Sequence, residues 1–228
     1  MNLPSPGDYI DIHNHGAGSR TGIFQIENLM THENRKPDFE TGLTYSGGIH
    51  PWFLTQNNLE PHLTIVRELS LHKNIIALGE AGFDKIKGPD QPLQRKAFEE
   101  QIRISEEVSK PLFIHCVRSW DELLEVHKKL RPEQPWIVHG FRGKKELALQ
   151  LISKGMYLSF WFDFIVRPES ARLIQSLPHE RIFLETDGSD IDIRTIYKKV
   201  AADLNLSVSS LIYIIYSNFG AIFKNKMV

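Results

Sequence analysis

The sequence predicts an α/β protein built as a TIM (β/α)8-type barrel. Short apolar runs bounded by turn residues recur along the chain, and most are followed by a segment whose apolar residues fall three and four apart. The later apolar runs are continuous, as expected for strands that are buried on both faces. This alternation predicts a parallel sheet with helical crossovers, and eight strands favour a closed barrel over the alternative, an open doubly wound sheet.

The expected elements follow one another in a regular order, except in the N-terminal third. The eight strands are expected at 8–12, 22–29, 43–48, 75–80, 111–116, 135–140, 156–160 and 181–186. Helical apolar periodicity places helices at 59–73, 92–110, 119–130, 143–154, 169–177, 192–204 and 207–225. The segment "THENRKPDFETG" (31–42) is polar, is broken by Pro37 and Gly42, and lacks an apolar stripe. We therefore expect the first or second crossover helix to be missing or reduced to a loop.

Length and composition indicate one ordinary globular domain over residues 1–228. The chain carries 41% apolar and 24% charged residues, and no repeat or Ser/Gly-rich linker divides it. Its single cysteine, Cys116, excludes an intrachain disulfide. The N-terminus lacks the basic and apolar segments of a signal peptide, and no apolar run is long enough for a membrane span, so a cytoplasmic location without membrane attachment is expected. A net charge of -1 argues against a stable nucleic-acid complex.

Side chains that can bind a metal follow five of the expected strands. Residues two apart in a strand project on the same face, so His13 and His15 can converge on one ion. In a barrel the chemistry lies at the C-terminal ends of the strands. The residues found there are His13, His15, Glu80, His115, His139, Glu185 and Asp187. Each alone could be a buried histidine or a helix cap, but their shared position favours a functional site.

The combination of ligand types indicates a catalytic centre. Imidazole and carboxylate without thiolate suit a catalytic divalent site better than a closed structural zinc site. The four histidines together with Glu80 and Asp187 exceed what one ion needs, and they suit two ions bridged by a carboxylate. Zinc, manganese and magnesium all remain open, because such sites accept each of them.

Six motifs, in this order, resemble the TatD family of metal-dependent deoxyribonuclease-like hydrolases within the amidohydrolase superfamily. They read "DIHNH", "GGIHPW", "ALGEAGFDK", "PLFIHC", "IVHGFRG" and "FLETDG", and the resemblance covers about residues 8–220. It implies a TIM barrel with two divalent ions, the first bound by His13, His15 and Asp187 and the second by His115 and His139. Glu80 would bridge the ions, and Asp187 would also accept the proton of a water that attacks a phosphodiester.

The resemblance also implies substrate contacts, although several motifs differ from the family pattern. His50 matches a motif histidine that can contact a substrate phosphate, and Arg118 and Arg142 follow two strand ends where they could hold phosphate oxygens. Arg118 lies three residues after His115, whereas the family commonly has arginine two residues after this histidine. The aromatic run 159–164 could stack bases, or it could pack in the core.

Three functions are compatible with these residues. The first is phosphodiester hydrolysis, with DNA, short oligonucleotides or small phosphodiesters as substrates. The second is amide, lactone or carboxylic ester hydrolysis, as in other amidohydrolases, although Glu80 stands where several of those relatives carry a carbamylated lysine. The third is a metal-binding scaffold without catalysis, which the shortened N-terminal third would suit.

Overall fold

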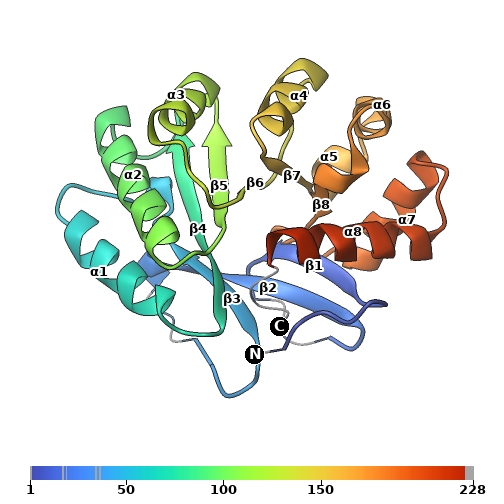
Figure 1. Cartoon of the computed structure of the whole chain (residues 1–228), viewed down its shortest axis with the longest axis horizontal. Helices are drawn as coiled ribbons and strands as arrows, with labels where there is room; N and C mark the ends of the chain where they lie inside the picture. The colour runs from blue at the N-terminus through green and yellow to red at the C-terminus, as the bar shows by residue number, and fades with distance from the viewer. Residues whose placement is uncertain (1, 17, 19, 34, 36, 224–228) are drawn as a thin grey trace. The chain divides into compact units, whose positions relative to one another are not determined.

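The eight strands form one sheet in which spatial order follows chain order, β1 to β8 (Figure 1). The structure is a computed structural model and describes residues 2–16, 18, 20–33, 35 and 37–223. The strands are β1 (Tyr9–Asn14), β2 (Ile23–Met30), β3 (Thr44–Gly48), β4 (Ile75–Asp84), β5 (Leu112–Val117), β6 (Trp136–Val138), β7 (Tyr157–Phe160) and β8 (Ile182–Leu184). The pairs β1–β2, β3–β4, β4–β5, β6–β7 and β7–β8 are parallel. Beyond β8, the backbone N–H of Asp187 donates to the carbonyl of His13.

This strand order confirms the predicted α/β class of the eight-stranded barrel type. All eight strands lie where the sequence predicts them, with ends that differ by a few residues. The largest difference is at β4, which runs to Asp84, four residues beyond its expected end. The last three strands are buried along their whole length, as their continuous apolar sequences predict.

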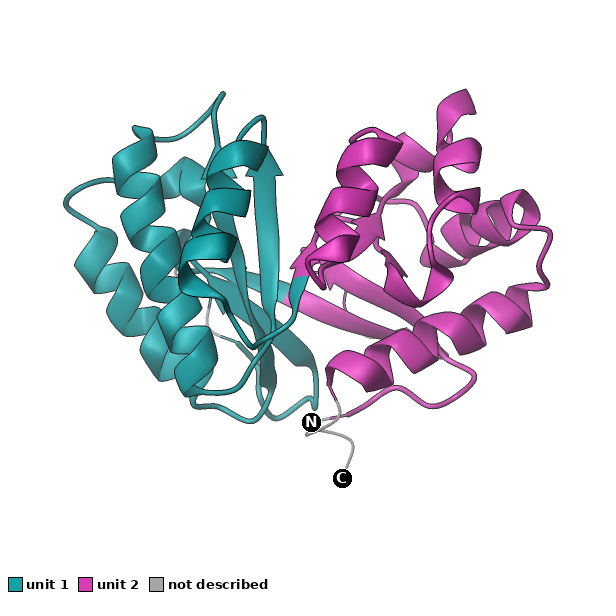
Figure 2. Ribbon diagram, turned by 45° about the horizontal axis from the view of Figure 1, so that its top comes forward, with its two compact units in different colours: residues 1, 28–136 teal, residues 2–27, 137–228 magenta. Residues whose placement is uncertain are grey.

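Two compact units divide the described chain, residues 28–136 (unit 1) and residues 2–27 with 137–228 (unit 2) (Figure 2). In unit 1 the helices are α1 (Leu59–Ser70), α2 (Gln91–Glu107) and α3 (Trp120–Leu130), and α2 packs on β4. The side chain of Asp90 accepts from the amide of Leu93 and begins α2, with Pro92 in the first turn. Phe83 of β4 meets Phe98 of α2 edge to face, with ring centroids 5.2 Å apart. A single domain over 1–228 stays a prediction.

In unit 2 the helices are α4 (Lys145–Ser153), α5 (Phe162–Ile165), α6 (Pro168–Gln175), α7 (Ile193–Asp203) and α8 (Val208–Ile222). Both α7 and α8 contact β1. The buried hydroxyl of Tyr197 on α7 accepts from the amide of Ile10 and donates to its carbonyl, at 3.1 and 3.0 Å. Short α5 lies in the aromatic run that the sequence did not assign to a helix. No single described helix is long and apolar enough to cross a membrane, and only α7 and α8 taken as a pair, bent by 106°, pass that test of length and composition.

The N-terminal third lacks helical crossovers in its described part, as predicted. The connection from β1 to β2 contains no described α-helix, and the connection from β2 to β3 contains only the 3-10 turn Thr31–Glu33. Pro37 and Gly42 lie in this second connection. The expectation of a missing or reduced helix is therefore confirmed for both crossovers, within the residues that the structure describes.

Candidate metal centre

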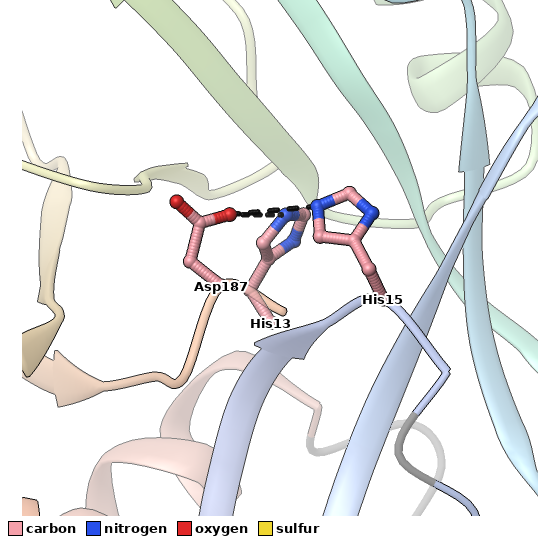
Figure 3. Close-up of side chains that lie close together, drawn as sticks. All are labelled: His13, His15 and Asp187. Atoms are coloured by element: carbon pink, nitrogen blue, oxygen red, sulfur yellow. Dashed lines mark ion pairs between the residues drawn. The ribbon is translucent and has the colours of Figure 1, made fainter. Parts of the chain in front are cut away.

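Three metal-competent side chains converge at one end of unit 2 (Figure 3). His13 and His15 come from the end of β1, and Asp187 comes from the turn after β8. Nε2 of His13 lies 3.9 Å from Oδ1 of Asp187, and Nε2 of His15 lies 3.4 Å from the same oxygen. One ligand atom from each residue lies within 4.8 Å of the others, a spacing that suits a common ion. The spacing of two residues on a strand thus brings both imidazoles to one carboxylate.

A buried hydrogen-bond network holds β1 to the segment after β8. Asp11 accepts from the amide and the hydroxyl of Thr186, at 2.9 and 2.6 Å, and from the side-chain amide of Asn14 at 3.1 Å. Burial raises the pKa of Asp11 to about 6, and these hydrogen bonds oppose the rise. Because Asp11 precedes His13 by two residues and Thr186 precedes Asp187, the network fixes the distance between the two ligands.

A second group in unit 2 involves His139 and Glu185. Nδ1 of His139 lies 3.5 Å from Oε1 of Glu185, and the His139 ring lies 4.6 Å from the ring of His13. Gly140 donates its amide to Oε1 of Glu185 at 2.6 Å. Oε2 of Glu185 is buried with no hydrogen-bond partner among the described residues. The sequence places Glu185 among the strand-end side chains that can bind a metal, whereas the family resemblance gives it no ligand role; this geometry makes it a candidate ligand.

Unit 1 carries its own cluster around Glu80. Oε1 of Glu80 lies 2.7 Å from Nδ1 of His115 and 3.1 Å from Nε2 of His50. All three side chains are buried, and their ligand atoms lie within 4.8 Å of one another. Nδ1 of His50 accepts from the amide of Trp52, so in a neutral imidazole the proton lies on Nε2 and faces Glu80. His50 is thus directed at a carboxylate, and its contact with a substrate phosphate stays a prediction.

Asn28 of β2 fixes the carboxylate of Glu80. Its side-chain nitrogen donates to Oε2 of Glu80 at 3.3 Å, and its oxygen accepts from the Glu80 amide at 3.2 Å and from the hydroxyl of Ser46 at 3.1 Å. Gly79 allows the close approach of the neighbouring strand, because its φ is 98° and a Cβ would lie 2.3 Å from the carbonyl oxygen of Phe113. No sequence pattern marks Asn28, since a lone asparagine in an apolar run has no fixed meaning.

Asp84, at the end of β4, is a second functional candidate that the sequence reasoning missed. Its Oδ2 lies 3.1 Å from Nε2 of His115 and accepts from the indole of Trp52 at 2.5 Å. Burial alone would raise the pKa of Asp84, but hydrogen bonds from His115, Trp52 and the amides of Lys87 and Ile86 together hold it below its ordinary range. The motif "ALGEAGFDK" contains Asp84, but the expected strand ended at Glu80, so its side chain was not placed near the site.

The two predicted arginines lie in different surroundings. Arg118 is exposed, with φ of 53° in the turn that leaves β5. Arg142 is exposed after β6, and its guanidinium lies 5.0 Å from the centre of the Trp161 ring. Phe160 and Phe164 of the aromatic run are buried with centroids 5.7 Å apart, so these two pack in the core while Trp161 is half-buried.

The donors in both units fit a divalent cation. Imidazole nitrogens and carboxylate oxygens are ligands that zinc, manganese and other divalent ions accept. The buried Oε2 of Glu185 requires a positive partner or a donor, and burial without one is costly. The chain therefore carries His/Glu/Asp clusters suited to metal binding.

Residues 25–224 match the family model described as TatD related DNase. The chain belongs to the TatD family. The match includes Glu80, His115, His139 and Asp187, whereas His13 and His15 precede it. Family membership confirms the resemblance on which the expected ligand set rests, and the role of each residue stays a prediction.

Several known proteins resemble the chain in sequence or in fold. YabD of Bacillus subtilis, named an uncharacterized metal-dependent hydrolase, is 30% identical over 133 residues, covering 56% of this chain and 52% of YabD. A 3'-5' ssDNA/RNA exonuclease TatD from Citrobacter koseri is 28% identical over 165 residues, covering 70% of this chain and 63% of that protein. The crystal structure of YJJV, a TatD homologue from Escherichia coli, superposes with a TM-score of 0.78 at 19% identity, covering 96% of this chain and 99% of YJJV.

These similarities differ in how much of each protein they include. The chain spans about half to two-thirds of the length of the first curated relatives it matches. The likeness to YJJV covers nearly all of both chains and supports the barrel-type fold. Family and fold are thus established.

Proposed function

We propose that this protein is a metal-dependent phosphodiesterase that hydrolyses DNA or short oligonucleotides. The observation that supports it best is the pair of clusters around Asp187 and Glu80, found in a family whose relatives are named nucleases and metal-dependent hydrolases. A single domain, a cytoplasmic location and a transient rather than stable nucleic-acid complex belong to the same proposal.

Two divalent ions are proposed, of zinc, manganese or magnesium. His13, His15 and Asp187 would hold one, since their ligand atoms already lie within 4.8 Å of one another. Glu80 and His115 would hold the other, because Nδ1 and Oε1 face each other at 2.7 Å. When bound, such ions polarise phosphoryl oxygens and lower the pKa of water. The bridging role of Glu80 and the participation of His139 stay predictions.

Asp187 is the proposed proton acceptor. Its Oδ1 is shared by the two histidines, and its side chain is about one-fifth exposed, so it can reach both ligand and solvent. A carboxylate in this position can take a proton from an attacking water. His13 and His15 orient it, and the network around Asp11 keeps it at the end of β1.

A basic cavity in unit 2 supports an anionic substrate. It has a volume of about 500 Å³ and is lined by nine residues, Arg142, Gly143, Lys144, Lys145, Glu146, Phe164, Glu169, Arg172 and Leu173. Four of these are cationic and two are anionic. The cavity begins three residues after His139 in the chain, and Arg142 is among the residues proposed to bind phosphate. Lysine and arginine side chains in such a cavity favour phosphate groups through charge and hydrogen bonding.

The test combines metal content with a substrate screen. Elemental analysis of untagged protein purified without chelator should find about two divalent ions per chain. Single-stranded DNA, RNA, a small phosphodiester and a carboxylic ester or amide should then be compared with the metal present. Turnover of the phosphodiesters alone supports the proposal, whereas turnover of the ester or amide alone favours the other amidohydrolase chemistry.

Substitution of Asp187 separates an enzyme from a scaffold. Asp187→Asn should abolish phosphodiester turnover while the protein stays folded, as judged by circular dichroism. Asp190→Asn is the matched control, because Asp190 is an exposed carboxylate three residues further along. Metal binding without turnover in the unsubstituted protein, on every substrate tested, would contradict hydrolysis and favour the scaffold.

A further inference from the structure

The buried contact between His115 and Asp84 carries an inference beyond the ligand set. The two nitrogens of the His115 ring face two different carboxylates, Nδ1 towards Glu80 at 2.7 Å and Nε2 towards Asp84 at 3.1 Å. His115 and the two acidic residues are buried. A neutral imidazole carries one proton, so the carboxylate that accepts this proton decides which nitrogen offers a lone pair to an ion.

Asp84 is the carboxylate whose surroundings make it a hydrogen-bond acceptor. Its Oδ1 accepts from the amides of Ile86 and Lys87, at 2.7 and 2.8 Å. Its Oδ2 accepts from the indole of Trp52 and faces Nε2 of His115. Three N–H groups therefore point at one carboxylate, and Nε2 of His115 faces it as well. An ion is therefore not needed to stabilise Asp84.

Trp52 connects the same carboxylate to the loop of the "GGIHPW" motif. Its backbone amide donates to Nδ1 of His50, while its indole donates to Oδ2 of Asp84. Lys87 also lies over the Trp52 ring, 3.9 Å from its centre. One tryptophan thus fixes the partners of both histidines that face Glu80.

We propose that Asp84 is a positioning residue that accepts the Nε2 proton of His115. The Nδ1 lone pair of His115 is thereby directed to the metal beside Glu80, and Trp52 holds Asp84 in place. The proposal rests on the metal-binding part of the proposed function. It assigns the ligand atom of His115 and gives a purpose to two motif residues that the ligand set leaves unused. A carboxylate behind a metal-binding histidine orients the ring and raises its basicity.

The experiment measures metal affinity, not only turnover. Metal-free protein is titrated with Mn²⁺ or Zn²⁺ in competition with a chromophoric chelator. Asp84→Asn has nearly the same shape, but the amide offers one acceptor oxygen where the carboxylate offers two. Its NH₂ group would face one of the N–H donors that now point at Asp84. The affinity of this variant for the metal ion should fall about 10- to 100-fold. Trp52→Phe, which removes the indole donor to Asp84, should lower the metal affinity about tenfold or less.

Matched controls separate positioning from a general loss of structure. Asp90→Asn changes a carboxylate in the same connection that caps α2, and it should leave metal affinity unchanged. Trp136→Phe is the control for Trp52, because the buried Trp136 indole nitrogen has no hydrogen-bond partner among the described residues. Circular dichroism and thermal unfolding verify that each variant is folded before it is titrated.

A double-mutant cycle tests whether Asp84 acts through His115. If it does, Asp84→Asn combined with His115→Ala should bind metal as weakly as His115→Ala alone. If the affinity losses of the two single variants multiply in the double variant, Asp84 acts independently of His115 and the proposal is overturned. A metal affinity of Asp84→Asn within twofold of that of the unsubstituted protein would overturn it as well. Absence of metal binding in the unsubstituted protein would instead contradict the proposed function itself, so the two failures can be distinguished.

Discussion

Replacing Asn28 by aspartate should destabilise the metal-free protein strongly, and divalent cations should reverse much of the loss. The Asn28 amide nitrogen donates to Oε2 of Glu80 at 3.3 Å, and both residues are buried. Aspartate would place a carboxylate oxygen where that nitrogen lies. A favourable hydrogen bond would thus become a contact between two acidic groups.

The size of the effect follows from this distance. Two like charges 3.3 Å apart, as Asn28 Nδ2 and Glu80 Oε2 are, repel by about 5 kcal/mol at an effective dielectric constant of about 20. Protonation of either carboxyl group would remove the repulsion, and at pH 7 it costs about 4 kcal/mol when the pKa starts at its ordinary value. The destabilisation caused by the repulsion is therefore limited to about this amount. The free energy of unfolding should fall by about 3 to 4 kcal/mol. Asn28→Ala, which loses the hydrogen bonds without adding a charge, should lose about 1 to 3 kcal/mol.

The assay is urea unfolding followed by circular dichroism, in EDTA and again with excess Mn²⁺ or Zn²⁺. A cation near Glu80 would offset the repulsion, so the ion should stabilise Asn28→Asp more than it stabilises the unsubstituted protein. Asn218→Asp is the matched control, because the buried Asn218 amide donates to the backbone carbonyls of His179 and Ile182, neither of which is a proposed ligand. It should be destabilised without a comparable rescue by metal.

Two results would contradict a cation site beside the Asn28–Glu80 contact. Equal stability of Asn28→Asp and Asn28→Ala in EDTA would show that the amide of Asn28 does not face the carboxylate of Glu80. Equal stabilisation by metal of Asn28→Asp and Asn218→Asp would show that the cation does not bind beside Glu80.

Three further predictions concern unit 2. Tyr197→Phe should lower the free energy of unfolding by about 1 to 3 kcal/mol in denaturant titrations and leave metal affinity unchanged, because two buried hydrogen bonds to Ile10 are lost. Burial raises the pKa of Asp11 to about 6, so the protonated carboxyl stabilises the folded protein below its ordinary pKa, near 4, and this stability is lost as pH rises through 6. The free energy of unfolding, measured in EDTA, should therefore fall by about 3 kcal/mol between pH 4 and 7. Asp11→Asn should remove this pH dependence. Arg142→Ala combined with Lys144→Ala should raise KM for an oligonucleotide several-fold without changing kcat, and high salt should reduce the difference.

The sequence predicted the elements of the fold well because their periods are local. Continuous apolar runs such as those of β7 and β8 are buried on both faces in the structure, and helices with a clear stripe begin at recognisable caps, as α2 does at Asp90. Short α5 could not be predicted, since Phe162–Ile165 lies in an aromatic run too short to show a helical period. The end of β4 was placed too early because Gly82 breaks the apolar pattern, although the strand continues to Asp84.

The residues that support the site are the part that the sequence could not supply. His13 and His15 were recognisable because two histidines at strand spacing have few structural uses. Asn28 and Asp84 matter through contacts with Glu80 and His115, residues that are distant in the chain, and no local pattern marks such a contact. Their roles depend on which strands are neighbours, so they become visible only when the fold is known.

The two carboxylates of β4 show why a buried charge can have different purposes within one strand. Every residue of β4 is buried, and an acidic group there costs several kcal/mol unless its charge is satisfied. Asp84 receives N–H donors at both oxygens, so the protein alone can hold it. Oε1 of Glu80 instead faces Nε2 of His50, which carries the proton in the neutral ring, and Nδ1 of His115, which can offer a lone pair. The surroundings of Asp84 suit a positioning group, and those of Glu80 suit a ligand, which is why the two acids are given different roles.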